Sequence, residues 1–209
     1  MKNSPITSSI KIKKESACKN CLRPLELCIC GKVTCFLSPI KILILQHPQE
    51  QYKLLNSAKL CNLVISNSVL KVGFSWPNLK EALGENVNIK EWGVLFLKGI
   101  IEPTRKIELW DCRKKCLLPI NTKISGIVVL DGSWKQAKTL WWRNPWLLKL
   151  IRITLNPDHL SIRLQAKKHA LSTAEAIAMA LECLGHSSNF SNILLNQYYD
   201  FIIKSNMKI

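Results

Sequence analysis

Apolar residues along this chain form short runs of strand length that alternate with stretches of helical period. Four runs rich in Ile, Leu and Val predict buried strands at residues 39–46, 92–97, 126–130 and 148–155. Apolar side chains at helical spacing predict helices at residues 50–63, 134–142, 173–184 and 189–204. Strands separated by helices favour an α/β fold with a mainly parallel sheet and helices on both faces. The polar, turn-rich stretch 78–90 predicts no clear element.

The N-terminal segment differs in composition from the rest of the chain. Residues 1–16 are rich in Ser, Lys and Asn and predict a flexible basic arm, whereas residues 17–36 are rich in cysteine. We call residues 17–36 the cysteine knuckle. The pattern then places one larger domain at residues 37–209.

Four thiols lie within thirteen residues of the cysteine knuckle: Cys18, Cys21, Cys28 and Cys30. Zinc binds four soft ligands in a tetrahedron, so this spacing predicts a structural zinc ion. Cys35 is an alternative fourth ligand, and a set of free thiols is the alternative to a metal site. Four thiolates would leave no open coordination position, which excludes a catalytic role for that zinc.

Positive charge is in large excess. The chain of 209 residues has 30 Lys and Arg against 14 Asp and Glu, a formal net charge of +16, and basic clusters are interleaved with seven Trp. This favours a polyanionic partner such as a nucleic acid, although a basic solvated surface would look the same. No apolar run reaches the about 20 residues of a membrane span, and the N-terminus lacks a secretory signal pattern. We therefore expect a cytoplasmic protein that does not enter membranes.

A carboxylate follows the predicted strand at residues 126–130. Asp131 should lie at the carboxyl edge of the sheet, where α/β proteins bind ligands. Gly132 permits a sharp turn, and Ser133 can cap the next helix. Turn formation and capping alone would also explain these residues.

A second helix start has the same two interpretations. Ser172 and Glu175 fit the S-x-x-E capping box, which accounts for both side chains. The free N–H groups at such a helix start, including that of Thr173, also attract carboxylates and phosphates.

Four motifs, in this order, resemble the DTW-domain family of tRNA-uridine aminocarboxypropyltransferases, and the similarity runs from Cys18 to the last predicted helix. These motifs are the four cysteines with Arg23-Pro24, then Gln46-His47-Pro48-x-Glu50 leading to Asn56-Ser57, then Asp131-Gly132-Ser133-Trp134, and finally Arg163 followed by Leu171-Ser172-Thr173-x-Glu175-Ala176.

Three positions depart from the family pattern. Ser57 and Ser133 stand where the family has threonine, a change that keeps the hydroxyl group. The segment after Trp92 lacks the proline that the family would have there, which puts the local loop geometry in doubt.

The resemblance implies an enzyme that transfers the 3-amino-3-carboxypropyl group of S-adenosylmethionine to N3 of a uridine in tRNA and releases methylthioadenosine. It also implies that residues 37–209 are a catalytic domain with a SPOUT-like fold. Whether the chain forms a knot in that fold is not decided by the resemblance. S-adenosylmethionine would be the co-substrate, zinc the structural metal and tRNA the partner. The sequence does not indicate an oligomeric state.

The resemblance also assigns site residues. Asp131 is the expected general base, with binding of the cofactor amino group as its second role. The residues expected to border the cofactor are Leu130, Gly132, Ser133, Trp134, Ser172, Thr173 and Glu175. Trp134 could equally belong to the core. The residues expected to contact RNA are His47, Asn56, Arg163, Lys167 and Lys168, of which the two lysines could equally be part of a solvated loop.

Two other functions fit parts of the same sequence. An S-adenosylmethionine-dependent RNA methyltransferase would share the fold and the cofactor. A non-catalytic zinc-containing RNA-binding protein would explain the basic surface and the cysteine knuckle but not the Asp131 and Ser172 motifs. Ribosomal RNA is an alternative substrate to tRNA.

Overall fold

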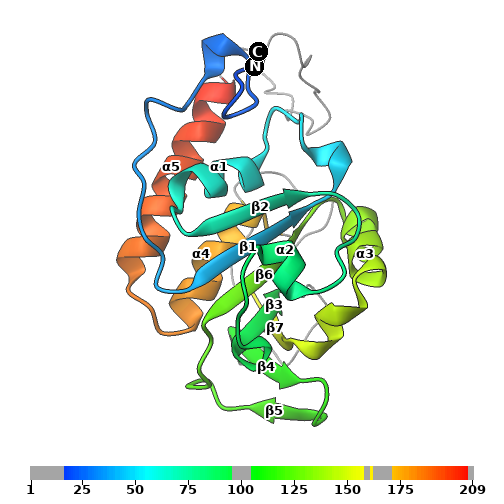
Figure 1. Ribbon diagram of the computed structural model, residues 1–209. Coiled ribbons are helices and arrows are strands. Elements are labelled where there is room, and N and C mark those ends of the chain that lie inside the picture. The colour runs from blue at the N-terminus through cyan, green and yellow to red at the C-terminus, as the bar shows by residue number, and fades with distance from the viewer. Residues whose placement is uncertain (1–16, 96–104, 158–160, 162–170, 207–209) are drawn as a thin grey trace.

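The computed structural model describes residues 17–95, 105–157, 161 and 171–206 (Figure 1). Within these ranges the chain builds one seven-stranded sheet in the order β2-β1-β6-β3-β7-β4-β5. Neighbours from β2 to β7 are parallel, and β4 and β5 add an antiparallel edge. The strands are β1 (Lys41–Gln46), β2 (Ser68–Val72), β3 (Trp92–Leu95), β4 (Ile107–Asp111), β5 (Cys116–Leu118), β6 (Gly126–Asp131) and β7 (Ile151–Leu155). The predicted mainly parallel sheet is confirmed.

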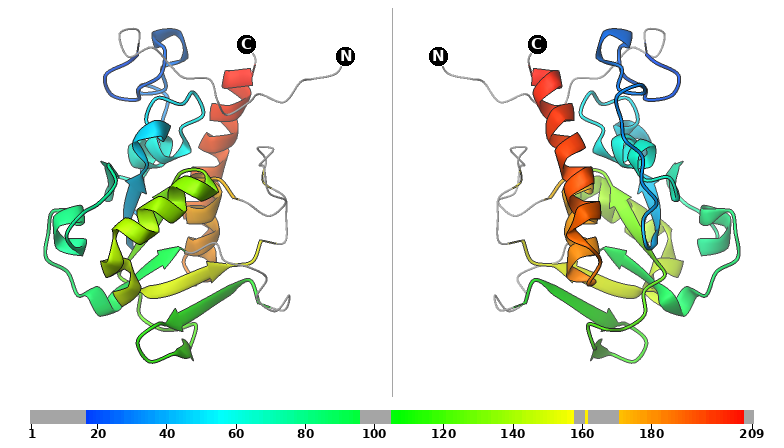
Figure 2. Two further views of the ribbon diagram at one scale, coloured as in Figure 1. Left: turned by 90° about the vertical axis from the view of Figure 1, so that its right-hand side faces the viewer. Right: turned by 90° about the vertical axis from the view of Figure 1, so that its left-hand side faces the viewer.

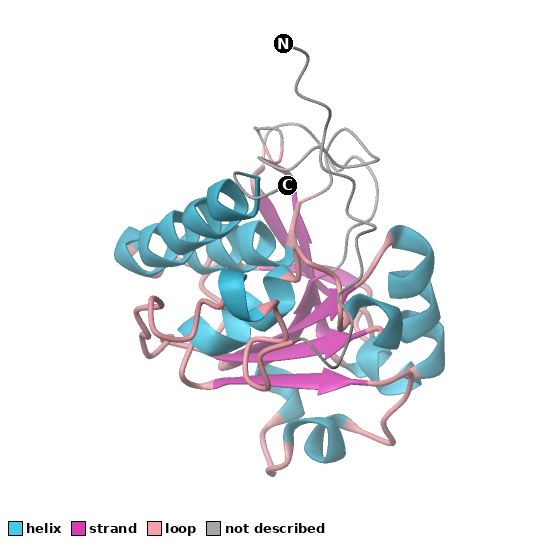
Figure 3. Cartoon of the chain, turned by 90° about the horizontal axis from the view of Figure 1, so that it is seen from above, coloured by secondary structure: helices cyan, strands magenta, loops and turns pink. Residues whose placement is uncertain are grey.

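Helices cover both faces of this sheet (Figures 1 and 3). They are α1 (Ser57–Val64), α2 (Leu79–Leu83), α3 (Trp134–Arg143), α4 (Thr173–Cys183) and α5 (Ser188–Asn206). Helices α1, α4 and α5 pack on one face, and α2 packs on the other together with residues of α3 and of the short 3-10 helix Pro145–Lys149. Turning the molecule to either side brings α3 or α5 to the front (Figure 2). Among the described helices, none is both long and apolar enough to cross a membrane.

Strand β1 shows why the apolar runs predicted strands. Ile42 and Ile44 belong to the core under α1, α4 and α5, while Leu43 and Leu45 belong to the core on the opposite face. Successive side chains of a strand point to opposite faces, so a strand buried on both sides must be apolar throughout. The central strands β1 and β6 meet this condition, and their sequences therefore identify them.

Several element boundaries differ from the prediction. Helix α1 begins at Ser57 instead of residue 50, because the Asn56 side chain caps it by accepting the Lys59 N–H at 2.9 Å. Strand β7 begins at Ile151 because residues 145–149 form a 3-10 helix. Strand β3 is described to Leu95, and the last two residues of its predicted range lie outside the described residues.

Candidate functional site

The carboxyl ends of β1 and β6 lie side by side, with Gln46 paired in register with Asp131. Helix α4 begins at the same edge. Thr173 donates its hydroxyl to Asp131 Oδ1, and Gln46 Nε2 donates to Asp131 Oδ2 at 2.9 Å. Strand β1 and helix α4, which are distant from Asp131 in sequence, therefore hold its carboxylate from both sides, at the edge where the sequence predicted it.

The orientation of Gln46 is fixed by a second amide. Gln46 is fully buried, and its Nε2 also donates to Asn56 Oδ1 at 2.9 Å. Asn56 Nδ2 in turn donates to the carbonyl oxygens of Glu50 and Gln51 at 3.3 and 3.0 Å. These donations leave one orientation for each amide, so Gln46 must present its N–H to Asp131. The cost is that Gln46 Oε1 is buried without a hydrogen-bond partner among the described residues.

The loop after Asp131 is clamped to the turn after β1. Ser133 Oγ accepts the Gln136 N–H at 3.4 Å, and Gln136 Oε1 accepts the Ser133 N–H at 2.6 Å, which completes a capping box. Gln136 Nε2 also donates to Gln49 Oε1 at 3.0 Å. Gly132 lies so close to α3 that an added Cβ would be 2.8 Å from Gln136 Cβ. Ser133 thus acts as the helix cap that its position predicted.

Gly132→Ala is expected to lower the free energy of unfolding by about 1–3 kcal/mol, because the new methyl overlaps the first atom of a side chain rooted in α3. Thermal unfolding measures the loss. Gly31→Ala is the matched control, since nothing lies within 4 Å of a Cβ at Gly31. Equal stability of the two variants would contradict the close approach at Gly132.

The start of α4 forms the predicted capping box. Ser172 Oγ accepts the Glu175 N–H at 3.2 Å, and Glu175 Oε2 accepts the Ser172 N–H at 2.8 Å. Glu175 Oε2 also accepts the Ser161 hydroxyl at 2.6 Å, and Glu175 is buried. Ser172 and Glu175 therefore fix the start of α4, and through it Thr173 beside Asp131.

His47 and Trp134 flank this edge. The buried His47 ring accepts the Gln49 N–H at Nδ1 (3.3 Å) and meets the edge of the Phe74 ring at a centroid distance of 5.0 Å. Burial lowers the pKa of His47, which favours the neutral ring. Trp134 is 40% exposed at the first position of α3, so it is not a core residue. Leu130 is half-buried and packs against the core on the face of α2.

Only some of the residues predicted to contact RNA are described by the structure. Asn56 is buried, and its amide bonds internally to the network that holds Asp131. This network is a structural role that the prediction for Asn56 did not include. Arg163, Lys167 and Lys168 lie outside the described residues.

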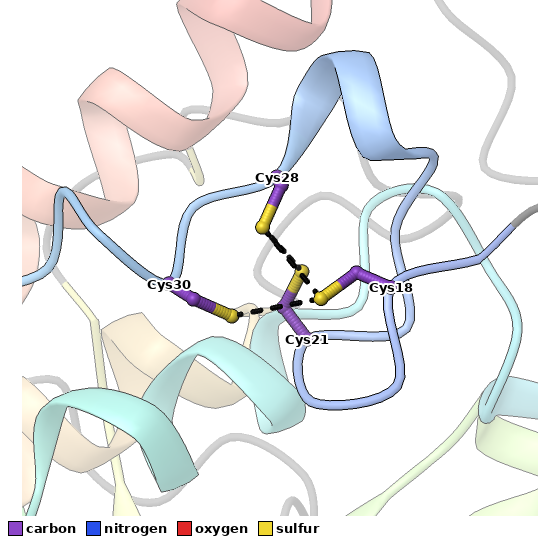
Figure 4. Close-up of side chains that lie close together, drawn as sticks. All are labelled: Cys18, Cys21, Cys28 and Cys30. Carbon is purple, nitrogen blue, oxygen red and sulfur yellow. Dashed lines mark hydrogen bonds between the residues drawn. The ribbon is translucent and has the colours of Figure 1, made fainter.

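The four predicted zinc ligands converge in the cysteine knuckle (Figure 4). Sγ–Sγ distances are 3.6 Å for Cys18–Cys28, 3.7 Å for Cys21–Cys28 and 3.8 Å for Cys18–Cys30. A tetrahedral zinc with Zn–S bonds of about 2.3 Å requires sulfur atoms about 3.8 Å apart. The residues present therefore fit a zinc ion. Cys35 is exposed, donates to the Leu63 carbonyl and is not among the four thiols that converge, which favours Cys30 over Cys35 as the fourth ligand.

Backbone geometry and a buried cation support this thiol cluster. Hydrogen bonds from the backbone of Cys21 and Asn20 lower the pKa of Cys18 to about 6, which favours its thiolate, whereas burial raises the pKa of Cys21 and Cys30. The buried Arg23 guanidinium lies 4.3 Å from the Phe201 ring centroid and donates to Ser205 Oγ at 2.7 Å. Arg23 thereby connects the cysteine knuckle to the C-terminal half of α5.

Two glutamines of the site have roles that were not predicted from the sequence. Gln46 orients Asp131, and Gln136 clamps the following loop. The available signal was a polar residue at the end of the apolar run 39–46, since a buried polar side chain needs a partner. Gln136 stands at the third helical position after Ser133, which is the capping-box spacing.

These features define an α/β domain that follows a four-cysteine candidate metal site and holds a carboxylate at the carboxyl edge of parallel strands. The DTW domain family model matches residues 15–206, and the chain therefore belongs to this family.

Curated relatives share about a quarter of their residues with this chain. The "tRNA-uridine aminocarboxypropyltransferase 2" of Macaca fascicularis is 26% identical over 189 residues, covering 88% of this chain and 61% of the relative. The protein of the same name from Drosophila melanogaster is 26% identical over 181 residues, covering 82% of this chain and 67% of the relative. The chain thus spans about three fifths of the length of the macaque relative. No solved structure is significantly similar to this chain.

Proposed function

We propose that this chain is a tRNA-uridine aminocarboxypropyltransferase that uses S-adenosylmethionine as the group donor. The observation that carries the proposal is the Asp131 carboxylate, which Gln46 and Thr173 hold at the carboxyl edge of the sheet within the Asp131-Gly132-Ser133-Trp134 motif. Membership in the DTW domain family and the names of the curated relatives support the same reaction.

Asp131 is the proposed general base. A uridine N3–H is a weak acid, and N3 becomes a good nucleophile only as its proton leaves. Asp131 accepts that proton while N3 forms a bond to Cγ of the aminocarboxypropyl group. The bond from Cγ to the sulfonium sulfur breaks with its electron pair on sulfur, and methylthioadenosine leaves. Because sulfonium is a good leaving group, the remaining task of the protein is alignment of the two substrates.

The residues around Asp131 are proposed to align the donor. The loop of Leu130, Gly132, Ser133 and Trp134 and the α4 start at Ser172, Thr173 and Glu175 border the same sheet edge. Backbone N–H groups at a helix start favour a carboxylate such as that of the donor amino acid. The clamp between Gln136 and Gln49 would keep the loop in one position during binding.

The remaining assignments follow the same proposal. The tRNA would contact Arg163, Lys167 and Lys168, whereas His47 and Asn56 are buried and would contribute by holding the segments beside Asp131. Zinc in the cysteine knuckle would be structural, since four thiolates complete its coordination. A cytoplasmic location agrees with this, because reduced thiols persist there.

Product analysis tests the proposal. Purified protein incubated with S-adenosylmethionine and unmodified tRNA should release methylthioadenosine, and a reaction without RNA should release none. Adenosylhomocysteine together with a methylated nucleoside would instead make the chain a methyltransferase. Transfer to ribosomal RNA but not to tRNA would overturn the substrate assignment, and RNA binding without any product would overturn the reaction.

A further inference from the structure

Helix α3 carries an exposed stripe of aromatic and basic side chains. Trp134, Lys138 and Trp142 are spaced by four residues, so they follow one another along a single face of the helix. Trp134 is 40% exposed and Trp142 is 74% exposed. The Lys138 ammonium lies 5.8 Å from the centroid of the Trp134 ring, within the range of a cation–π contact. We call these three residues the α3 stripe.

Folding does not account for this composition. Residues 134–143 contain three basic residues and no acidic ones, and Lys135 stands in the first turn, where the helix dipole favours negative charge. Trp142 keeps most of its large apolar surface in water instead of burying it. Trp141 packs against the core, but two exposed Trp and three cations on one ten-residue helix match a surface that binds a polyanion with exposed π-faces.

The stripe begins at the candidate site and leads away from it. Trp134 follows Asp131 by three residues, and Trp142 lies eight residues further along α3. At 1.5 Å per residue this separation is about 12 Å along the helix axis. Stacked nucleotides rise about 3.4 Å each, so the stripe is as long as a stretch of three or four nucleotides.

A second aromatic and basic contact continues this surface at the other end of α3. The Arg143 guanidinium lies 5.1 Å from the centroid of the Phe74 ring, and Phe74 is itself exposed. Phe74 contacts the His47 ring, and His47 N donates to the Asp131 carbonyl at 3.0 Å. Arg143 and Phe74 therefore connect the C-terminal end of α3 to the Asp131 edge through the buried His47.

We propose that the α3 stripe is the docking surface for the unpaired RNA nucleotides that flank the target uridine. A nucleobase stacks on Trp142, and Lys138 and Lys135 lie against the phosphates. This inference rests on the proposed function for the identity of the RNA. RNA is the occupant that the charge of +16 and the continuity with the Asp131 edge select.

Binding of unmodified tRNA to the full chain, measured by fluorescence anisotropy, tests the proposal. Trp142→Ala should weaken binding roughly ten-fold, the contribution of one base–aromatic stack. Lys138→Ala should reduce the slope of log affinity against log salt by about 1, as expected for the loss of one phosphate contact. Tyr199→Ala is the control, because Tyr199 is also an exposed aromatic residue, at 40%, but lies on α5, and its loss should leave tRNA affinity unchanged.

The same assay separates this proposal from the proposed function. If Trp142→Ala binds tRNA as tightly as the unchanged chain, the assignment of the α3 stripe as the docking surface is wrong, even where aminocarboxypropyl transfer is observed. If the unchanged chain transfers no group but Trp142→Ala still weakens tRNA binding, the docking surface stands and the reaction fails. A change of oligomeric state on Trp142→Ala with unchanged tRNA affinity would make the stripe a contact between copies of the chain and overturn the proposal.

Discussion

Replacing Asp131 with asparagine is expected to lower the kcat of group transfer by about 100- to 10,000-fold, the contribution of a positioned general base. The variant should fold, because asparagine fits the same hydrogen bonds. Its carbonyl oxygen can accept from Gln46 Nε2, and its amide can donate to Thr173 Oγ1 once that hydroxyl turns. Single-turnover transfer at saturating tRNA and donor measures the chemical step.

The matched control is Asp111→Asn. Asp111 is likewise an aspartate at the end of a strand, it is buried, and it accepts the N–H groups of Arg113 and Lys114 at 2.9 and 3.2 Å. Its replacement should leave kcat unchanged. Near-normal turnover of Asp131→Asn with unchanged tRNA affinity would show that Asp131 is not the general base. A weaker donor affinity with normal kcat at saturation would assign Asp131 to the cofactor amino group instead.

Cys21→Ser is expected to abolish zinc binding and to lower the free energy of unfolding by on the order of 3 kcal/mol or more, because metal binding to a folded site is itself folding free energy. Cys21 is buried in the core that includes α5, and Arg23 extends this contact to Phe201 and Ser205. The loss should therefore reach beyond the cysteine knuckle. Zinc content by atomic emission and thermal unfolding with and without a chelator measure it.

Cys35→Ser serves as the control for that experiment. Cys35 is exposed and its Sγ bonds only to a backbone carbonyl among the described contacts, so zinc content and stability should be unchanged. Purified protein without stoichiometric zinc, or a Cys21→Ser variant as stable as Cys35→Ser, would show that the four thiols do not form a structural metal site.

The amount of structure that the sequence predicted depended on burial. Strands β1 and β6 are buried on both faces, so their apolar runs were unambiguous. Strands β4 and β5 form the antiparallel edge, where exposed and half-buried positions interrupt the apolar pattern, and they were missed. Strand β2, whose side chains are only partly buried, was missed for the same reason.

Helix α2 was missed although its local signals are present. Asn78 caps the helix by accepting the Glu81 N–H at 2.9 Å, and Gly84 ends it with φ of 92°. The five residues between these two signals are too few to show a helical period. The surrounding stretch is polar and turn-rich, so no helix was predicted there.

The candidate site was predictable only in part. Asp131 could be placed because a carboxylate directly after a buried strand must lie at the sheet edge. The side chains of Gln46 and Thr173, which donate to its carboxylate, could not be placed from the sequence, since they come from segments 85 and 42 residues away. The register of β1 against β6 and the placement of α4 bring them together, and both are properties of the tertiary packing.

Transfer from two differently labelled forms of S-adenosylmethionine shows which group of the donor the chain moves to tRNA. One form carries the label in the carboxyl group and the other in the methyl group, and unmodified tRNA is the acceptor. We expect the carboxyl label to enter a tRNA uridine nucleoside and the methyl label to leave with methylthioadenosine. Entry of the methyl label into RNA, or entry of neither label, would contradict the proposed reaction.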